Sequence, residues 1–304
     1  MNAKISAATA AILWGFTYVL TTSWLPTQPL FLAAFRALGG ALLLLALVRC
    51  LPPRSWWSRI MVLGTLNAGL FFGLFFVAAT RLPGGIAAIF QALTPLAVIF
   101  IAWGVLGARP TLGKIGAVLL GALGVSLVVL SNTAQLDPLG IAAAIGSMLA
   151  IATGGVLLNK WGMPPMPLLG CTGWQLLVAG VELSVVALLM HDIPDHLNST
   201  HWLGLLLLAS ALTALPFALW FGAIERIGAV KVAPFMLLVP IVAFILDAMV
   251  KGLQPTGLQL LGAVLVISGL LLSQKDRSKP VKASEASKDL TQAESAATSS
   301  TSSH

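Results

Sequence analysis

The sequence contains ten apolar segments, each long enough to cross a lipid bilayer as a helix. Such a helix needs about 20 mostly apolar residues to span about 30 Å of hydrocarbon. Charged residues make up only 9% of the 304 residues, whereas a soluble domain carries about 25%. The sequence therefore predicts an all-α integral membrane protein with ten transmembrane helices. We place them at residues 5–25, 30–50, 57–79, 84–106, 113–131, 138–158, 168–190, 202–223, 229–250 and 257–273.

Lysine and arginine residues are distributed unevenly between the two sides of the membrane that these helices define. With the N-terminus in the cytoplasm, Arg81 and Lys251 fall in outside segments, Arg36 falls within a helix, and the remaining 14 of the 17 basic residues lie inside. This asymmetry is that of the positive-inside rule. We therefore expect a multi-pass protein of a bacterial inner (plasma) membrane with both termini in the cytoplasm. The net charge of +7 then reflects topology and not a nucleic-acid partner.

The second half of the chain repeats the first after a shift of 145 residues. Five helices per half is an odd number, so the two halves enter the membrane from opposite sides and form inverted repeats. Inverted repeats around a site at the membrane midplane are the architecture of alternating-access transporters, although a duplicated structural scaffold would show the same pattern. The residues that coincide are Arg81 with Arg226, Pro95 with Pro240, Gly107 with Gly252, Pro110 with Pro255 and Thr111 with Thr256.

Repeat and composition together divide the chain into three parts. Residues 1–131 are predicted to form the first five-helix repeat, and residues 132–273 the second, inverted one. Residues 274–304 are rich in Ser, Thr, Ala, Lys and Glu and carry no apolar period, which predicts a disordered cytoplasmic tail. The loops between the helices are short, so we expect function to reside within the bilayer.

Several motifs follow one another at the spacing of a known family. They are Trp14-Gly15-Phe16-Thr17-Tyr18, Arg36-Ala37-Leu38, Arg81-Leu82-Pro83-Gly84-Gly85, Leu136-Asp137-Pro138-Leu139-Gly140, Trp174-Gln175-Leu176 and Trp220-Phe221-Gly222-Ala223-Ile224-Glu225-Arg226. On these motifs the chain resembles the drug/metabolite transporter superfamily, specifically its ten-helix EamA-type exporters and their PecM-type branch. The resemblance implies a central cavity between the halves and export of small metabolites such as amino acids, pigments or aromatic compounds. Two residues depart from the family pattern, because Ala108 replaces a common Glu and Asp247 stands where a small or apolar residue is expected.

Three prolines lie inside the predicted helices, namely Pro95, Pro216 and Pro240. A proline has no N–H, so each frees the carbonyl group four residues earlier. In hydrocarbon such carbonyls are tolerated only where protein or a water-filled cavity covers them. We interpret the three prolines as hinges or cavity-lining kinks, and the alternative is that they are bends that only improve packing. The freed carbonyls belong to Gln91, Leu212 and Met236.

Charged residues within the predicted helices are costly, and each is therefore a candidate for function. Glu182 and Asp247 are candidates for proton coupling, because burial favours the protonated form of a carboxyl group. Alternatively, either one lies close enough to a helix end to reach water. Arg36 is the one embedded basic residue, and its expected role is structural, through a carboxylate or helix-end carbonyl groups.

Aromatic and polar residues at helical spacing predict a substrate cavity. Phe71 and Phe75 follow Asn67 at steps of four residues, so a regular α-helix places all three on one face. Apolar walls with one amide suit a partly aromatic or zwitterionic molecule, although an aromatic stripe more often faces lipid or packs against protein. The predicted cavity residues are Trp14, Tyr18, Asn67, Phe71, Phe75, Gln91, Thr94, Trp174, Gln175, Thr213 and Trp220.

The sequence predicts a secondary transporter that exports small amphipathic metabolites by alternating access, with a small-molecule substrate and membrane lipid as partners. Uptake and flipping of a lipid-linked sugar are the alternatives within this class. An intramembrane enzyme or a structural subunit is the alternative from another class, and the spans offer no converging nucleophile and base. We expect no cofactor and no metal, and we interpret the cluster closest to a metal site as a solvated loop. That cluster is His191, Asp192, Asp195, His196 and His201.

Overall fold

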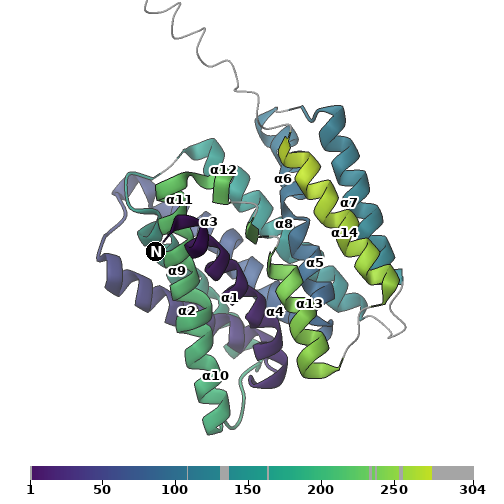
Figure 1. Ribbon diagram of the computed structural model, residues 1–304. Coiled ribbons are helices and arrows are strands. Elements are labelled where there is room, and N and C mark those ends of the chain that lie inside the picture. Colours follow the sequence, from purple (N-terminus) through teal and green to yellow (C-terminus); the bar gives the residue numbers. More distant parts are fainter. Residues whose placement is uncertain are drawn as a thin grey trace, which may run out of the picture.

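The computed structural model describes residues 2–107, 109–130, 137–162, 164–232, 235–236, 238–252 and 256–275 (Figure 1). These residues are helical apart from short connections, and none of them lies in a strand. Ala108, one of the two departures from the family pattern, and nearly all of the predicted tail lie outside the described residues.

Ten helical segments, which we call spans 1 to 10 in chain order, correspond to the ten predicted transmembrane helices. In the first half they are α1 (Ala3–Ser23); α2 (Pro29–Val48); η1 (Arg54–Trp56), α3 (Trp57–Gly64), η2 (Thr65–Leu70) and α4 (Phe71–Arg81), which together form span 3; α5 (Gly84–Ala92) and α6 (Thr94–Leu106), which form span 4; and α7 (Leu112–Leu130). In the second half they are α8 (Pro138–Trp161); α9 (Leu168–Leu189); α10 (Ser199–Ala209), η3 (Ser210–Ala214) and α11 (Leu215–Ile227), which form span 8; α12 (Ala229–Val232) and α13 (Leu238–Lys251), which form span 9; and α14 (Gly257–Lys275). Within the described residues, seven spans are long and apolar enough to cross a membrane, and α13 and α14 contain shorter apolar stretches. The predicted all-α, ten-helix membrane fold is confirmed.

Polar side chains begin several of these helices. The Asn2 side chain accepts a hydrogen bond from the Lys4 amide (3.1 Å) at the start of α1. Asp137 accepts one from the Leu139 amide (2.8 Å) at the start of α8, and Asn198 caps α10 in the same way. A helix leaves its first amide groups without partners inside the helix, and such caps satisfy them. The boundaries of spans 1, 6 and 8 are therefore set by the residue just before each apolar segment.

The helices pack in a pattern that is preserved when the two halves are exchanged. Span 2 packs along span 7, and span 5 packs along span 10, as α7 and α14 show at the right of Figure 1. Span 1 packs against spans 8 and 9, and its equivalent, span 6, packs against spans 3 and 4. Exchanging spans 1–5 with spans 6–10 maps each of these contacts onto another one of the set. This is the arrangement of the predicted inverted repeats.

Local backbone features recur at the same shift of 145 residues. The π-helical segments η2 and η3 begin at Thr65 and Ser210, which are related by that shift. The Thr65 hydroxyl donates to the Met61 carbonyl oxygen (3.0 Å), and the Ser210 hydroxyl donates to the equivalent carbonyl of Leu206 (2.6 Å). A π-helical turn holds one residue more than an α-helical turn and is frequent at functional sites. Spans 3 and 8, which are equivalent in the two halves, therefore carry the same π-helical irregularity.

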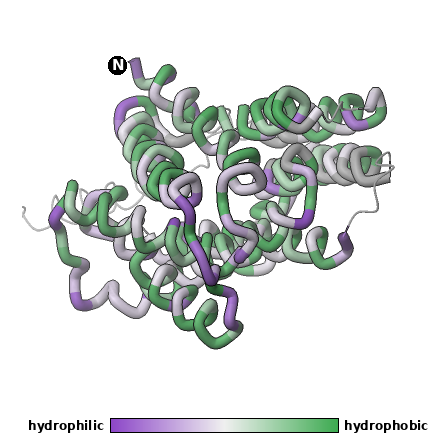
Figure 2. The backbone as a smooth tube through the Cα atoms, turned by 90° about the horizontal axis from the view of Figure 1, so that it is seen from below, coloured by the Kyte–Doolittle hydropathy of each residue, from purple (hydrophilic) through white to green (hydrophobic). Residues whose placement is uncertain are grey.

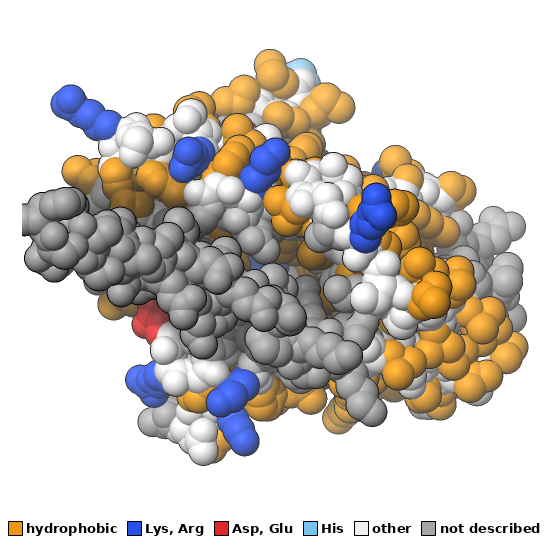
Figure 3. Space-filling model, turned by 90° about the horizontal axis from the view of Figure 1, so that it is seen from above, with side chains coloured by type: hydrophobic (Ala, Val, Ile, Leu, Met, Phe, Trp, Pro, Cys, Tyr) orange, Lys and Arg blue, Asp and Glu red, His pale blue; other side chains and the backbone are white. Residues whose placement is uncertain are grey.

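The surface of the molecule separates apolar flanks from charged ends. Figure 2 shows hydrophobic residues along the helices and hydrophilic ones mainly at helix ends and in connections. Figure 3, which is seen from above, shows several Lys and Arg side chains on that face. The orientation of the chain in the membrane stays a prediction. The exposed basic residues of the described chain on the expected cytoplasmic side are Lys4, Arg49, Arg54, Arg109, Lys160, Arg226 and Lys231.

Candidate transport path

Span 4 is broken where the sequence places Pro95. Helix α5 ends at Ala92 and α6 begins at Thr94, so the span is two helices instead of the single one predicted for residues 84–106. The break follows from the missing N–H of Pro95, which leaves the Gln91 carbonyl without its helical partner. The Thr94 hydroxyl donates to that carbonyl oxygen at 2.6 Å. A polar side chain thus covers the backbone group that proline frees.

The break in span 4 is also tied to span 6. The Gln91 side-chain amide donates to the Ser147 hydroxyl of α8 at 2.5 Å, and Ser147 in turn donates to the Ala144 carbonyl at 2.9 Å. Ser147 is fully buried, whereas Gln91 is half-buried. The structure therefore brings the predicted residues Gln91, Thr94 and Pro95 together and adds Ser147. The sequence carried no signal for Ser147, because a single serine in a span is common.

Span 9 also departs from a regular α-helix near the equivalent of Pro95. Between α12 and α13, Phe235 and Met236 are 3₁₀-helical, and Pro240, which follows them on α13, is buried. Pro240 is the equivalent of Pro95 under the 145-residue shift. Interrupted helices at matching positions in two inverted halves mark the binding region in several transporter folds, because their free backbone groups face a site near the midplane. Spans 4 and 9 therefore locate the candidate path.

Span 8 contains the third proline, and its freed carbonyl is bonded to Arg36. Pro216 follows Leu212 by four residues, and the Arg36 Nη2 atom on α2 donates to the Leu212 carbonyl oxygen at 3.1 Å. The Arg36 side chain is buried, with its guanidinium carbon 4.6 Å from the centre of the Phe72 ring. A carbonyl acceptor and an aromatic face both stabilise a buried guanidinium. This contact corresponds to the structural role expected of Arg36.

Two predicted cavity residues lie beside Arg36. The Tyr18 and Phe75 rings have centroids 5.3 Å apart, and the Phe75 centroid is 5.8 Å from the guanidinium carbon. Both side chains are buried, so they contact protein on nearly all sides. Phe71 contacts Phe75 at 5.8 Å and is half-buried. Tyr18, Arg36 and Phe75 thus form a packed cluster that joins spans 1, 2 and 3.

Asn67 lies between α8 and α9, away from this cluster. Its Nδ2 donates to Gln175 Oε1 at 2.9 Å, and Gln175 Nε2 lies 3.2 Å from Cys171 Sγ. The Asn67 amide also packs against Gly154, where a methyl group would come within 2.6 Å of the Asn67 Cγ. Asn67 lies in the π-helical η2, and the expected common face with Phe71 and Phe75 stays a prediction.

An aromatic cluster joins spans 1 and 8. Trp14 of α1 lies 5.5 Å from Phe217 and 5.3 Å from Trp220, measured between ring centroids, and all three side chains are half-buried. Phe221 stacks on Phe217 at 6.0 Å. We call Trp14, Phe217 and Trp220 the aromatic cluster. Phe217 was not among the predicted cavity residues, although its spacing from Trp220 and Phe221 indicated an aromatic stripe.

The remaining predicted residues lie elsewhere. The Trp174 indole donates to the Cys50 carbonyl at 2.8 Å, at the end of span 2. Thr213 is buried and donates to the Leu208 carbonyl at 2.6 Å within span 8. Asp247 is buried on α13. Within the described residues, no group of three His, Cys, Asp or Glu side chains has the geometry of a metal site.

Spans 3, 4 and 6 form one three-helix group, and spans 8, 9 and 1 form its equivalent. The groups meet where α5 packs against α13 and α1, and where α4 packs against α1. In the other half of spans 4 and 9, α6 packs mainly against α8, and α12 packs against α11. Because α5 follows Arg81 directly, the contact between the groups lies on the side of Arg81.

Comparison with known proteins gives matches over most of the chain. The model of the EamA-like transporter family matches residues 1–130 and 138–274. The chain is 37% identical to Protein PecM of Dickeya dadantii (strain 3937), over 94% of this chain and 98% of that protein. It is 27% identical to the probable amino-acid metabolite efflux pump of Salmonella typhimurium, over 88% of this chain and 93% of that protein. A solved crystal structure superposes with a TM-score of 0.64 at 18% identity, covering 91% of this chain and 99% of the other, which supports the fold alone.

Proposed function

Because the chain belongs to the EamA-like transporter family, we propose that it exports small amphipathic metabolites from the cytoplasm by alternating access. The substrates we propose are amino acids, aromatic compounds or pigment-like molecules. The Salmonella relative is named as a probable amino-acid metabolite efflux pump, which supports both the substrate class and the direction.

The observation that carries this proposal is that spans 4 and 9 both depart from a regular α-helix just before a proline. Pro95 and Pro240 lie at matching positions of inverted halves, and the Gln91 carbonyl beside Pro95 is covered by a polar side chain and not by helix. Backbone groups released from a helix at this depth can bind a polar group of a substrate, and the break lets the two ends of the span move separately.

The packing of the two three-helix groups supports one direction of opening. They meet through α5 and α13 and through contacts of α1 with α4 and α5, on the side of Arg81, which we expect to face outside. In alternating access the two halves exchange conformations, so a path closed on one side opens on the other. We infer that the present conformation is closed outward and accepts substrate from the cytoplasm.

The side chains along these spans support an amphipathic substrate. The aromatic cluster offers half-buried rings on spans 1 and 8, whereas Gln91 and Thr94 offer an amide and a hydroxyl at the break of span 4. Apolar walls with a few placed polar groups are typical of small-molecule sites. Export would be driven by a proton gradient, with Glu182 and Asp247 as candidate carriers, or by the gradient of the substrate itself.

Counterflow in proteoliposomes tests this function. Vesicles that contain the purified protein are loaded with unlabelled phenylalanine, and entry of labelled phenylalanine, tryptophan or other metabolites is measured. Exchange is expected for at least one aromatic or zwitterionic compound, and preference for a lipid-linked sugar would support the flippase alternative instead. Inside-out and right-side-out membrane vesicles then distinguish export from uptake.

The Thr94→Val variant tests the role of the break in span 4. It removes the donor to the Gln91 carbonyl, and a lost hydrogen bond of about 1 kcal/mol corresponds to about a five-fold loss of exchange. The matched control is Thr153→Val, because Thr153 makes the same kind of intrahelical bond, to Leu149 at 2.7 Å, inside an unbroken helix. Equal exchange by Thr94→Val and Thr153→Val would contradict a role for the break.

A further inference from the structure

A carboxyl group faces the π-helical segment of span 3. Glu182 of α9 is half-buried, and its Oε1 lies 2.6 Å from the hydroxyl of Thr65, the first residue of η2. Its Oε2 lies beside Gly69, where an added methyl group would come within 2.8 Å of it. At 1.5 Å per residue, Glu182 lies about 21 Å along the axis from Leu168 and about 10 Å from Leu189, the ends of α9. The carboxyl group therefore lies in the middle part of the span and not close to either of its ends.

The Thr65 hydroxyl has one proton and two acceptors within reach. Its oxygen lies 3.0 Å from the Met61 carbonyl oxygen and 2.6 Å from Glu182 Oε1. When Glu182 is ionised, its carboxylate can only accept, so Thr65 donates to Glu182. When Glu182 is protonated, it donates to the Thr65 oxygen and Thr65 donates to Met61, as helical threonines commonly do. The proton on Glu182 therefore decides which acceptor the hydroxyl serves.

The charged groups around α9 have other partners or lie at helix ends. In the described part of the chain, the polar side chain that bonds to Glu182 is Thr65 alone. Arg36 of α2 donates to the Leu212 carbonyl, and Arg59 of α3 lies over the Trp56 ring. A carboxyl group within a membrane span is costly, which marks Glu182 as a candidate for function. The other charged residues on elements that pack against α9 are Arg49 at the end of α2, and Glu225 and Arg226 in the last turn of α11.

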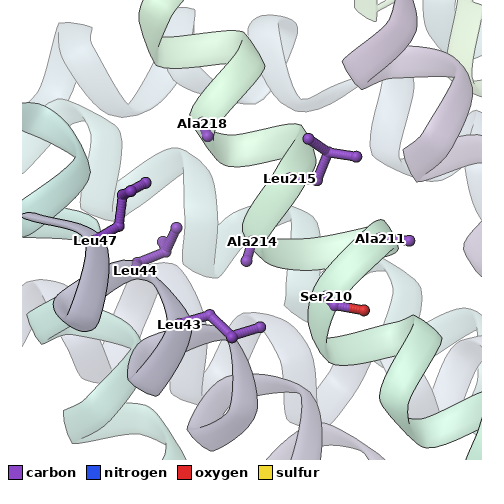
Figure 4. Close-up of a pocket in the computed structure, with 8 residues that line it drawn as sticks. All are labelled: Leu43, Leu44, Leu47, Ser210, Ala211, Ala214, Leu215 and Ala218. Atoms are coloured by element: carbon purple, nitrogen blue, oxygen red, sulfur yellow. The ribbon is translucent and has the colours of Figure 1, made fainter.

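The second half builds the same segment without a carboxyl group. Helices α2 and α9 are equivalent, and they begin at Pro29 and Leu168, so the shift between these two helices is 139 residues and not 145. The position equivalent to Glu182 is therefore Leu43. The positions equivalent to Thr65 and Gly69 are Ser210 and Ala214. Leu43, Ser210 and Ala214 line an apolar groove of about 440 Å³ between span 2 and span 8 (Figure 4). The fold therefore does not require a carboxyl group at this place, and Glu182 is an addition of the second half, where α9 faces span 3.

We propose that Glu182 and Thr65 form a proton-binding site that reports the charge of Glu182 to the backbone of span 3. A proton from water binds the Glu182 carboxylate, the resulting O–H donates to Thr65, and the Thr65 hydroxyl turns to the Met61 carbonyl. Release of the proton reverses these hydrogen bonds, so no other atom is gained or lost. Segment η2 is followed directly by Phe71–Phe76, which packs on Arg36. A change of hydrogen bonding in η2 is therefore transmitted to the helices that pack around Arg36. Coupling of this site to transport rests on the proposed function, whereas proton binding does not.

Infrared difference spectroscopy tests proton binding with protons as the probe. The full chain is reconstituted in vesicles of phosphatidylethanolamine and phosphatidylglycerol, and spectra at acidic and neutral pH are subtracted to show the C=O stretch of protonated carboxyl groups. Glu182→Gln is expected to remove one component, and Thr65→Val is expected to shift its frequency because a hydrogen bond is lost. Ser210→Ala is the matched control, since it removes the equivalent hydroxyl where no carboxyl group lies. Asp247→Asn identifies the other embedded acid. A spectrum unchanged by Glu182→Gln, in a variant that elutes like the parent, overturns the site.

Transport measurements test the coupling separately. The assay follows accumulation of labelled phenylalanine, or of another compound that the parent exchanges, under an imposed pH gradient. In Glu182→Gln this accumulation is expected to fall to the level seen without a gradient. Counterflow is expected to continue. Accumulation equal to that of the parent overturns the coupling. If the parent exchanges none of the compounds tested, the proposed function fails, and the infrared result still decides whether Glu182 and Thr65 bind a proton.

Discussion

A methyl group added at Gly154 has no room in this structure, and its effect can be estimated. The added Cβ would lie 2.6 Å from the Asn67 Cγ and 3.2 Å from its Nδ2. Because carbon atoms in contact stay about 3.5–4.0 Å apart, the Asn67 side chain must withdraw by about 1 Å. That movement breaks its hydrogen bond to Gln175, which is 2.9 Å long. The Gly154→Ala variant therefore loses both packing and a polar contact between spans 3 and 7.

The expected loss of stability follows from three contributions. Overpacking a filled site costs about 1–3 kcal/mol, and a lost hydrogen bond costs about 1 kcal/mol. Alanine is about 1 kcal/mol better than glycine inside a helix, which offsets part of this cost. We expect Gly154→Ala to lower the free energy of unfolding by about 1–3 kcal/mol. Gly155→Ala is the matched control, because a Cβ there meets nothing within 4 Å and should stabilise the protein.

Unfolding of the purified protein in mixed micelles, titrated with sodium dodecyl sulfate, measures these differences. The double variant Asn67→Ala/Gly154→Ala removes the obstructing amide, so it should recover most of the stability lost in Gly154→Ala. If Gly154→Ala is as stable as Gly155→Ala, Asn67 does not lie against α8. Asn67→Ala alone then tests the predicted cavity role, since a path-lining amide should alter which substrate is exchanged as well as stability.

Three further predictions concern the loops and the aromatic cluster. Arg81 Nη1 donates to Asp137 Oδ2 at 2.6 Å, and this hydrogen bond holds the Asp137 pKa below its usual value. The pair therefore contributes stability above the usual aspartate pKa, and this stability is lost as pH falls through the lowered pKa. Arg81→Gln should weaken this acid dependence in unfolding titrations. Cysteines placed singly at Arg81 and His196 should react with an impermeant reagent added outside, whereas one at Arg54 should not, and the opposite pattern reverses the topology. Trp14→Ala should raise the KM for exchange of labelled phenylalanine or another compound that the parent exchanges. Phe16, which is 41% exposed, is the control, and Phe16→Ala should leave the KM unchanged. Equal effects of the two variants would remove the aromatic cluster from the path.

Hydropathy predicted the ten spans because each apolar run is bounded by polar or turn-forming residues, and proline chemistry predicted where span 4 changes geometry. The missing N–H of Pro95 led directly to the Gln91 carbonyl, which Thr94 covers in the structure. The partner of the Leu212 carbonyl was not predictable, because Arg36 is distant in the chain and nothing local pairs them. A freed carbonyl can be found from the sequence, but its donor depends on which helices become neighbours.

The π-helical segments were not predicted, since one extra residue per turn leaves no mark on composition. Thr65–Leu70 contains no proline, and its residues suit an α-helix equally well. In the structure Asn67 lies in this segment and bonds to Gln175, while its common face with Phe71 and Phe75 stays a prediction. A hydrophobic period counts residues per turn, so a single π-helical turn displaces every assignment of faces that is carried across it.

The two halves share a backbone plan but differ in charge at equivalent places. Arg36 and Gln175 lie at matching positions of α2 and α9. Arg36 bonds to Leu212 of span 8, and Gln175 bonds to Asn67, the matching position of span 3. Leu43 matches Glu182 in the same way. If the halves were identical, the two conformations of an alternating-access cycle would have equal free energy. A preference of about 100 to 1 for one conformation needs only about 2.7 kcal/mol, and a single charge present in one half and absent from the other is large enough to supply it. The unmatched charges of Arg36 and Glu182 are therefore where a preference for one conformation should be sought.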